Sequence, residues 1–166
     1  MSTIPLLIFP LLMAFAAASD LLTMRISNRL VLLLIAAFLV VSLLAGLTLQ
    51  QFAWHAAYAL LVLVIAFAFF AFGWIGGGDA KFAAATALWF GGDLLLPYVV
   101  YAGLFGGVLT FVVLLLRRVP LTPLIAGTGW LARLHDAKSG VPYGIALAAA
   151  GIAVYSRSPI FEHFIG

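Results

Sequence analysis

The sequence predicts an all-α membrane protein that crosses the bilayer about six times, with its N-terminus outside. Of its 166 residues, 66% are hydrophobic and only 8% are charged, whereas a soluble domain carries about 25% charged residues. A chain with so few charges cannot cover its own surface in water, so we expect its apolar segments to face lipid. The length allows a single transmembrane domain over residues 1–166, with short loops between the spans.

Six apolar segments account for most of the chain. In order they are Ile4–Ala18, Leu30–Leu49, Phe52–Ile75, Phe82–Phe90, Leu94–Leu116 and Val141–Tyr155. A transmembrane helix needs about 20 apolar residues, so the fourth segment is short and has to borrow residues from its flanks. No basic residue precedes the first segment, unlike a cleavable signal peptide, and we therefore expect an uncleaved span there.

Polar or glycine-rich positions end these segments. They are Asp20 after the first, Gln50–Gln51 after the second, Gly76–Lys81 after the third, Gly91–Asp93 after the fourth and Arg117–Arg118 after the fifth. A longer polar stretch, Val119–Gly140, precedes the sixth. Within it, four apolar residues could line one side of a short interfacial helix, namely Leu124, Trp130, Leu131 and Leu134.

The basic residues indicate the orientation. If the six segments alternate in direction, seven of the eight Lys and Arg residues fall on one side, and these are Arg25, Arg29, Lys81, Arg117, Arg118, Arg133 and Lys138. The positive-inside rule makes this side cytoplasmic. Because topology accounts for the basic residues, the net charge of +3 does not indicate a nucleic-acid partner.

Two aspartates are the candidate catalytic residues. Asp20 and Asp79 both lie at the predicted cytoplasmic ends of spans, at similar depth, and a charge at membrane depth raises a functional question by default. Two neighbouring carboxyl groups cannot both ionise cheaply, so they share one proton. The ionised member can then activate a water and the protonated member can polarise a carbonyl. This chemistry hydrolyses a peptide bond without a metal or a covalent intermediate.

The residues around Asp79 and Asp20 leave alternatives open. Gly76, Gly77 and Gly78 either unwind the end of the third helix, with positive φ, to admit an extended substrate, or merely end that helix while Asp79 caps the next. Asn28 either hydrogen-bonds the loop near Asp20 or caps the second helix. Lys81 either holds substrate or a lipid phosphate, or is an interfacial lysine.

The remaining polar residues predict no metal and no cofactor. The chain has no cysteine, which excludes disulfides, zinc-thiolate sites and cysteine nucleophiles, and it has no clustered His and Glu pattern of a metal site. Asp93 falls on the opposite side from the pair. His55 lies with Trp54 near the outer end of the third span, where an interfacial position is favoured over a metal ligand. His135 and Asp136 are expected to be solvated.

Three motifs together resemble the type IV prepilin peptidase family. The segment Gly76–Lys81 resembles its GxGD motif, continued as GDxK. Asp20–Asn28 resembles its first aspartate region, in which a basic residue, an Ile and an Asn follow the Asp. Val141–Ala146 resembles the proline-tyrosine start of its last helix. One departure is Ser27, where many relatives have proline before the Asn.

This resemblance implies a membrane aspartic endopeptidase that removes the leader of prepilins at the cytoplasmic face of a bacterial inner membrane, with Asp20 and Asp79 as the catalytic pair. Long members of the family carry a cysteine-containing insertion and also N-methylate the new terminus. This chain resembles the short form associated with Flp pili, so we expect cleavage without methylation. Its expected partners are a prepilin substrate and membrane lipid.

Two other readings start from the same aspartates. In a transporter or channel subunit they would relay protons or bind cations, but such a relay favours carboxylates near the midplane, and here both lie at helix ends. A presenilin-like protease also has a GxGD motif, but its first aspartate usually follows a tyrosine. Ser19 precedes Asp20 here, which favours the prepilin reading.

Overall fold

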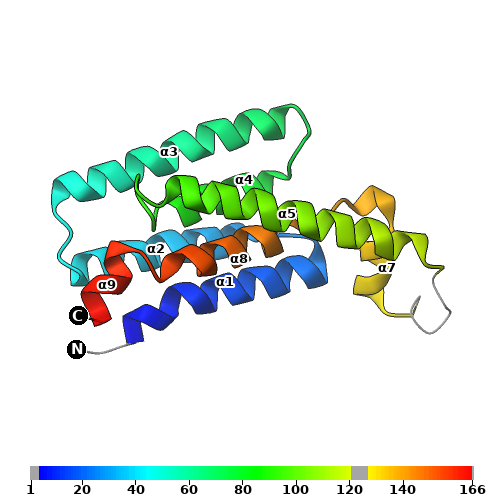
Figure 1. The fold of residues 1–166 in the computed structure, drawn as a ribbon, viewed down its shortest axis with the longest axis horizontal. Helices are drawn as coiled ribbons and strands as arrows, with labels where there is room; N and C mark the ends of the chain where they lie inside the picture. The colour runs from blue at the N-terminus through cyan, green and yellow to red at the C-terminus, as the bar shows by residue number, and fades with distance from the viewer. Residues whose placement is uncertain (1–3, 121–126, 166) are drawn as a thin grey trace.

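The chain folds into a bundle of α-helices in the computed structural model (Figure 1), which describes residues 4–120 and 127–165. The elements in order are α1 (Ile4–Thr23), α2 (Asn28–Leu44), α3 (Leu49–Ala71), α4 (Gly77–Ala87), α5 (Leu95–Arg118), α7 (Gly129–His135), the 3-10 helix η1 (Ala137–Ser139), α8 (Tyr143–Tyr155) and α9 (Pro159–Ile165). These two ranges contain no strand. The all-α membrane class that the sequence predicts is confirmed.

Among the residues that the structure describes, fewer helices could cross a membrane than the six predicted. α1, α3 and α5 are long and apolar enough, and α8 with α9 makes a fourth if this pair, bent by 48°, counts as one span. α4 has 11 residues, or about 16 Å of helix at 1.5 Å per residue, whereas the hydrocarbon core is about 30 Å thick. The predicted fourth span, Phe82–Phe90, is therefore too short to cross.

Two helices organise the packing. α8 contacts both α1 and α5, and α4 contacts α3, α2 and α8. Alanine and glycine dominate α8, and such small residues let helix backbones approach closely. α3 lies along one flank of the bundle (Figure 1), and only His55 and Ala66 of its side chains are buried. Its apolar side chains are otherwise left for lipid.

An aromatic core fills the end of the bundle where α1 begins and α4 ends. We use this name for the buried rings of Phe9, Phe38, Trp89, Phe90 and Tyr155. The ring of Phe9 lies 4.9 Å from that of Trp89 and 4.6 Å from that of Tyr155 between centroids. The indole N–H of Trp89 donates a 3.3 Å hydrogen bond to a backbone carbonyl of α2. The end of the predicted fourth span thus leaves the helix and is buried in the core.

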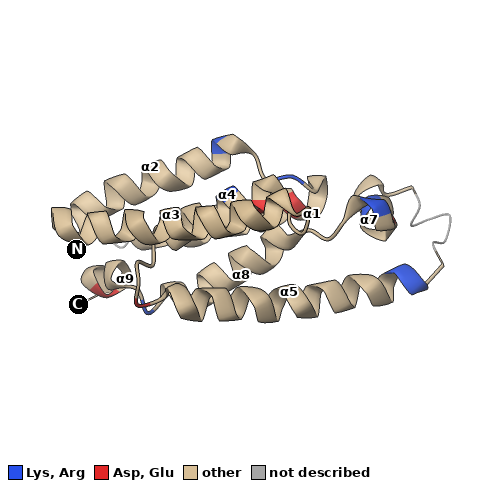
Figure 2. Ribbon diagram, turned by 90° about the horizontal axis from the view of Figure 1, so that it is seen from above, with Lys and Arg blue, Asp and Glu red and all other residues tan. Residues whose placement is uncertain are grey.

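The polar end of the molecule is marked by its charges. Figure 2 shows Lys and Arg at the ends of α5 and α7, far from α9. Trp130, Leu131 and Leu134 lie on α7 as the predicted short helix requires, while Leu124 lies outside the described residues. Which end faces the cytoplasm stays a prediction.

Candidate active site

Asp20 lies in the last turn of α1, and only 4% of its surface is exposed. The backbone N–H of Gly144, in the first turn of α8, donates a 2.7 Å hydrogen bond to its Oδ2. Amides in the first turn of a helix have no partner within the helix, so this N–H is free to hold a carboxylate oxygen. A Cβ at position 144 would stand 2.8 Å from that oxygen. It would also stand 2.7 Å from Ile26 Cδ1, so any side chain at position 144 would force the atoms around the Asp20 carboxylate to shift.

Asp79 lies in the first turn of α4, after the N-cap residue Gly76, and outside the helices that are long enough to span a membrane. Its pKa is raised from 3.8 to about 6. Burial is the larger cause and the negative charge of Asp20 the second, while a hydrogen bond with the backbone of Gly76 acts in the opposite direction. The charge of Asp20 is therefore close enough to disfavour ionisation of Asp79.

Both carboxyl groups line one cleft of about 840 Å³. Three segments form its walls: the end of α1 with the loop to α2, residues 73–79, and residues 139–143 before α8. This volume lies in the range of ligand-binding clefts, about 300–1,000 Å³. The structure thus brings together the two aspartates that are 59 residues apart in the sequence.

The three glycines before Asp79 do not unwind a helix. Gly77 and Gly78 begin α4, and Gly76 is its N-cap with φ −73°, so the expected positive φ is wrong for this run. A positive φ occurs instead at Gly73, which also lines the cleft. The alternative that Asp79 caps the next helix is wrong as well, because the cap is Gly76.

Asn28 and Lys81 contact each other. The Lys81 ammonium donates a 3.2 Å hydrogen bond to Asn28 Oδ1, which ties the start of α2 to the start of α4. Neither predicted role of Asn28 is found, because the cap of α2 is Ser27, whose hydroxyl accepts from the Leu30 N–H. Ser27, the departure from the family pattern, is thus the N-cap of α2.

The loop between α1 and α2 is held by side chains of α1. Met24 has φ 55°, a left-handed conformation that is uncommon for a residue with a side chain. The hydroxyl of Thr23 donates to the carbonyls of Ser19 and Arg25, at 2.7 and 3.2 Å. These bonds fix the loop that forms one wall of the cleft beside Asp20.

Sequence reasoning missed two residues that shape the site. Gly144 belongs to the segment that resembles the start of the family's last helix, and that motif was the available signal. Arg117 was interpreted only as a topology marker. Its guanidinium donates to the backbone carbonyls of Leu134 at 3.0 Å and Asp136 at 3.1 Å, and also to that of Gly140, where the cleft wall begins.

Other predicted residues lie apart from the pair. Asp136 caps η1 by accepting from the Lys138 N–H at 2.9 Å. His55 and Asp93 lie at the other end of α4, beside a second cavity. Within residues 4–120 and 127–165, no three His, Cys, Asp or Glu side chains are grouped as they would be to hold a metal.

Comparison with known proteins identifies the family. Searches of curated proteins and of solved structures gave no match. The model of the type IV leader peptidase family matches residues 7–111, which is more than half of the chain and includes both aspartates of the cleft. The chain therefore belongs to the type IV leader peptidase family.

Proposed function

We propose that this protein is an aspartic endopeptidase that cleaves the leader peptide of Flp-type prepilins at the cytoplasmic face of a bacterial inner membrane, with Asp20 and Asp79 as its catalytic pair. One observation carries the proposal: both carboxyl groups line the same cleft. Family membership supports leader peptidase activity in general. The absence of cysteine supports the short form, which cleaves without N-methylation.

The pair would act by general acid–base catalysis. One carboxylate takes a proton from a water, whose oxygen attacks the carbonyl carbon of the scissile bond. The protonated carboxyl donates its proton to the carbonyl oxygen. Collapse of the tetrahedral intermediate breaks the C–N bond as a proton passes to the leaving nitrogen, and the pair again holds one proton. The raised pKa of Asp79 supports a pair with a proton to donate near neutral pH.

The cleft also suits an extended peptide. Glycines form much of one wall, and Ser139 to Tyr143 form another. Backbone N–H and C=O groups next to glycine are accessible, so a substrate strand can approach and hydrogen-bond them. A leader peptide that leaves the membrane as an extended chain would place its scissile bond between the two carboxyl groups.

The test is cleavage of a co-expressed Flp-type prepilin by the wild type, Asp20→Asn and Asp79→Asn. The matched control is Glu162→Gln, which removes an exposed carboxylate on α9, at the other end of the molecule. Immunoblots of membranes check that all four proteins are equally abundant. We expect cleavage by the wild type and the control alone. Cleavage by either Asn variant would overturn the two-aspartate mechanism, and no cleavage by the wild type would overturn this substrate.

Two further measurements test the finer statements. The mass of the mature pilin N-terminus distinguishes an unmodified amine, which we expect, from a methylated one. Because the chain has no cysteine, single cysteines at the exposed positions Gln50 and Lys138 report orientation. A membrane-impermeant thiol reagent added to spheroplasts should label position 50 and not position 138. The reverse labelling would place the cleft outside.

A further inference from the structure

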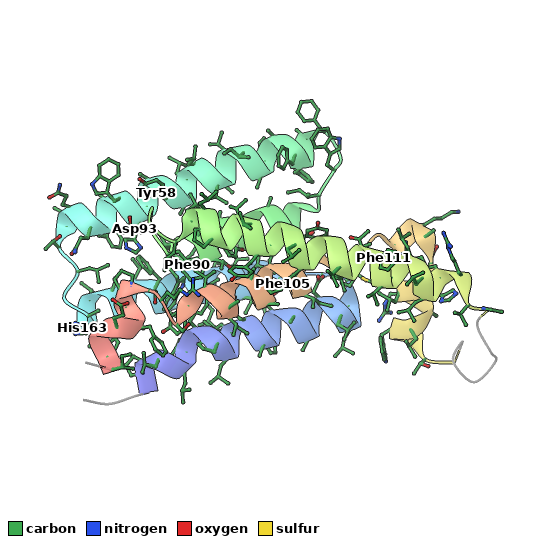
Figure 3. All side chains as sticks on the ribbon, viewed as in Figure 1. Tyr58, Phe90, Asp93, Phe105, Phe111 and His163 are labelled. Atoms are coloured by element: carbon green, nitrogen blue, oxygen red, sulfur yellow. The ribbon has the colours of Figure 1, made fainter. Side chains whose placement is uncertain are left out.

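A second cavity lies at the other end of α4 from the catalytic cleft. It measures about 350 Å³ and is bounded by the first turns of α3 and the segment that joins α4 to α5. Figure 3 shows Tyr58 and Asp93 beside each other there, with Phe90 below them. The aspartate pair contributes nothing to this cavity, so its use is independent of the proposed protease activity.

His55 presents a hydrogen-bond acceptor at this cavity. Its Nδ1 lies 2.7 Å from the Leu88 carbonyl oxygen, and because a carbonyl can only accept, Nδ1 carries a proton, which leaves Nε2 as the acceptor of the neutral ring. The side chain is 92% buried. A Cβ at position 91 would lie 3.1 Å from Nε2 and 3.2 and 3.3 Å from the ring carbons beside it, so glycine at position 91, with φ +61°, leaves space over this part of the ring. In the described part of the chain, Nε2 has no hydrogen-bond partner.

Asp93, Tyr58 and Trp54 add a carboxylate and two aromatic faces. The Tyr58 and Trp54 ring centroids lie 6.0 Å apart, and both side chains line the cavity together with Asp93. Across residues 4–120 and 127–165, no ion pair or hydrogen bond occupies the Asp93 carboxylate. The cavity therefore offers a negative charge, a neutral acceptor and π-faces, and the matching ligand is a cation with N–H donors.

We propose that this cavity binds a primary ammonium group, as carried by an ethanolamine phospholipid or by a free amine. The carboxylate of Asp93 accepts a charge-assisted hydrogen bond, His55 Nε2 accepts a second, and the Trp54 and Tyr58 rings contact the cation. The position suits a lipid head group, because Trp54 is 57% exposed and Gln50 and Gln51 begin α3 beside it. Trp and Tyr favour this depth at a membrane surface.

The test measures lipid binding by native mass spectrometry of the purified chain in detergent. Short-chain phosphatidylethanolamine and phosphatidylcholine are titrated against the wild type, Asp93→Asn and the control Glu162→Gln, whose carboxylate is on α9 and does not line the cavity. We expect the wild type and the control to prefer phosphatidylethanolamine, since the choline group has no N–H. Asp93→Asn should raise the apparent Kd for phosphatidylethanolamine about tenfold and leave that for phosphatidylcholine unchanged.

Further titrations distinguish the two sources of the ammonium group, and a second variant keeps the proposal testable. Free ethanolamine is titrated against the protein and in competition with phosphatidylethanolamine. Competition supports one ammonium site, and binding of ethanolamine without any lipid preference supports a soluble amine as its source. Equal affinity for both lipids with no ethanolamine binding, or an unchanged preference in Asp93→Asn, overturns the proposal. A second variant, Trp54→Leu, should weaken binding of the ammonium if the ring contacts it, and it covers the case in which Asp93→Asn does not fold.

Discussion

The two ends of α4 are built in different ways. Just after its end, Trp89 and Phe90 enter the aromatic core, where ring centroids lie about 5 Å apart, and the smaller second cavity lies beside Phe90. At its start, Asp79 faces a cleft whose walls are held by backbone hydrogen bonds to Asp20 and to Arg117. One end is stabilised by packing of apolar surface. The other keeps an open volume beside two carboxyl groups.

This difference teaches which changes should affect stability and which should affect activity. Truncating a side chain in the aromatic core leaves a cavity, and this lowers the free energy of unfolding. Hydrogen bonds at the cleft hold side chains in position, so a change there alters geometry that catalysis needs within a fraction of an ångström. Variants at the two ends should therefore separate the two properties.

The largest expected effect is the difference in activity and stability between Asp79→Asn, at the cleft, and Phe38→Ala, in the aromatic core. Asp79→Asn should reduce prepilin cleavage by about 100-fold or more, the usual contribution of general acid–base catalysis, with no loss of folded protein. Phe38 is fully buried in the aromatic core. Phe38→Ala should therefore lower the free energy of unfolding by about 3 kcal/mol and leave the cleavage rate per folded molecule unchanged. Thermal unfolding and in-detergent cleavage assays measure both. Equal losses of activity in the two variants would break the comparison.

The next effect concerns the backbone contact at Asp20. Gly144→Ala keeps the amide donor but adds a Cβ that would stand 2.7 Å from Ile26 Cδ1, 2.8 Å from Asp20 Oδ2 and 3.1 Å from Asp20 Cβ, so the Asp20 side chain and its neighbour have to shift. A displacement of about 1 Å can cost about 100-fold in rate, and we expect a loss of cleavage approaching that size. Gly103→Ala, on the open surface of α5 with no atom within 4 Å, is the matched control. Full activity in Gly144→Ala would show that this contact does not position Asp20.

Much of the cleft could be predicted from the sequence. Charged residues are few in this apolar chain, and a carboxyl group at membrane depth is costly. These two facts identify Asp20 and Asp79 as candidate site residues from the sequence. The partners that hold the cleft were harder to predict. Gly144 and Arg117 act through backbone N–H and C=O groups, and a backbone partner has no signature in the residue type. Lys81 and Asn28 contact each other through their side chains, but the two residues are 53 positions apart and the sequence does not show that their helices begin side by side.

The number of spans could not be predicted for a different reason. Hydropathy measures how apolar a segment is, and both a lipid-facing and a core segment satisfy it. Phe82 to Phe90 is apolar because α4 and the residues after it are buried among other helices, and Trp89 has no exposed surface. Helix length was decisive there, because α4 ends at Ala87 with Leu88 as its C-cap. The predicted segment Leu94–Leu116 agrees with α5 to within two residues at each end, whereas the first predicted segment, Ile4–Ala18, stops five residues before the end of α1.

The third effect is a pH dependence of stability. The folded-state pKa of Asp79, about 6, is above its unfolded value near 3.8, so this residue favours folding below about pH 4 and the contribution is lost as the pH rises through 6. At pH 8 the ionised group therefore destabilises the fold by up to about 3 kcal/mol. Asp79→Asn removes this cost. Its Tm should exceed that of the wild type by several degrees at pH 8 and match it at pH 4.

If the Tm difference between Asp79→Asn and the wild type were the same at pH 4 and at pH 8, the raised pKa would not belong to Asp79. Glu162→Gln again serves as the control, because its exposed carboxylate should leave the Tm difference between the two pH values unchanged. The result would also sharpen the comparison between the ends of α4. A residue that lowers stability at working pH is tolerated at the cleft, whereas the aromatic core contains no ionisable carboxyl.

The smallest effect concerns Arg117, whose three bonds to backbone carbonyls hold the segment that becomes the wall of the cleft. Arg117→Gln should raise KM for the prepilin by about fivefold to tenfold, because the substrate then has to order that wall when it binds, while kcat changes less. This corresponds to about 1 kcal/mol, the net value of a typical hydrogen bond. Arg117→Lys should give an intermediate KM, since an ammonium cannot match the planar fork of a guanidinium.

Arg118→Gln, one residue on and exposed, is the control for charge and should match the wild type. If it raised KM as much as Arg117→Gln, charge at the end of α5 would attract the substrate or lipid, and the hydrogen-bonded wall would not be what sets affinity.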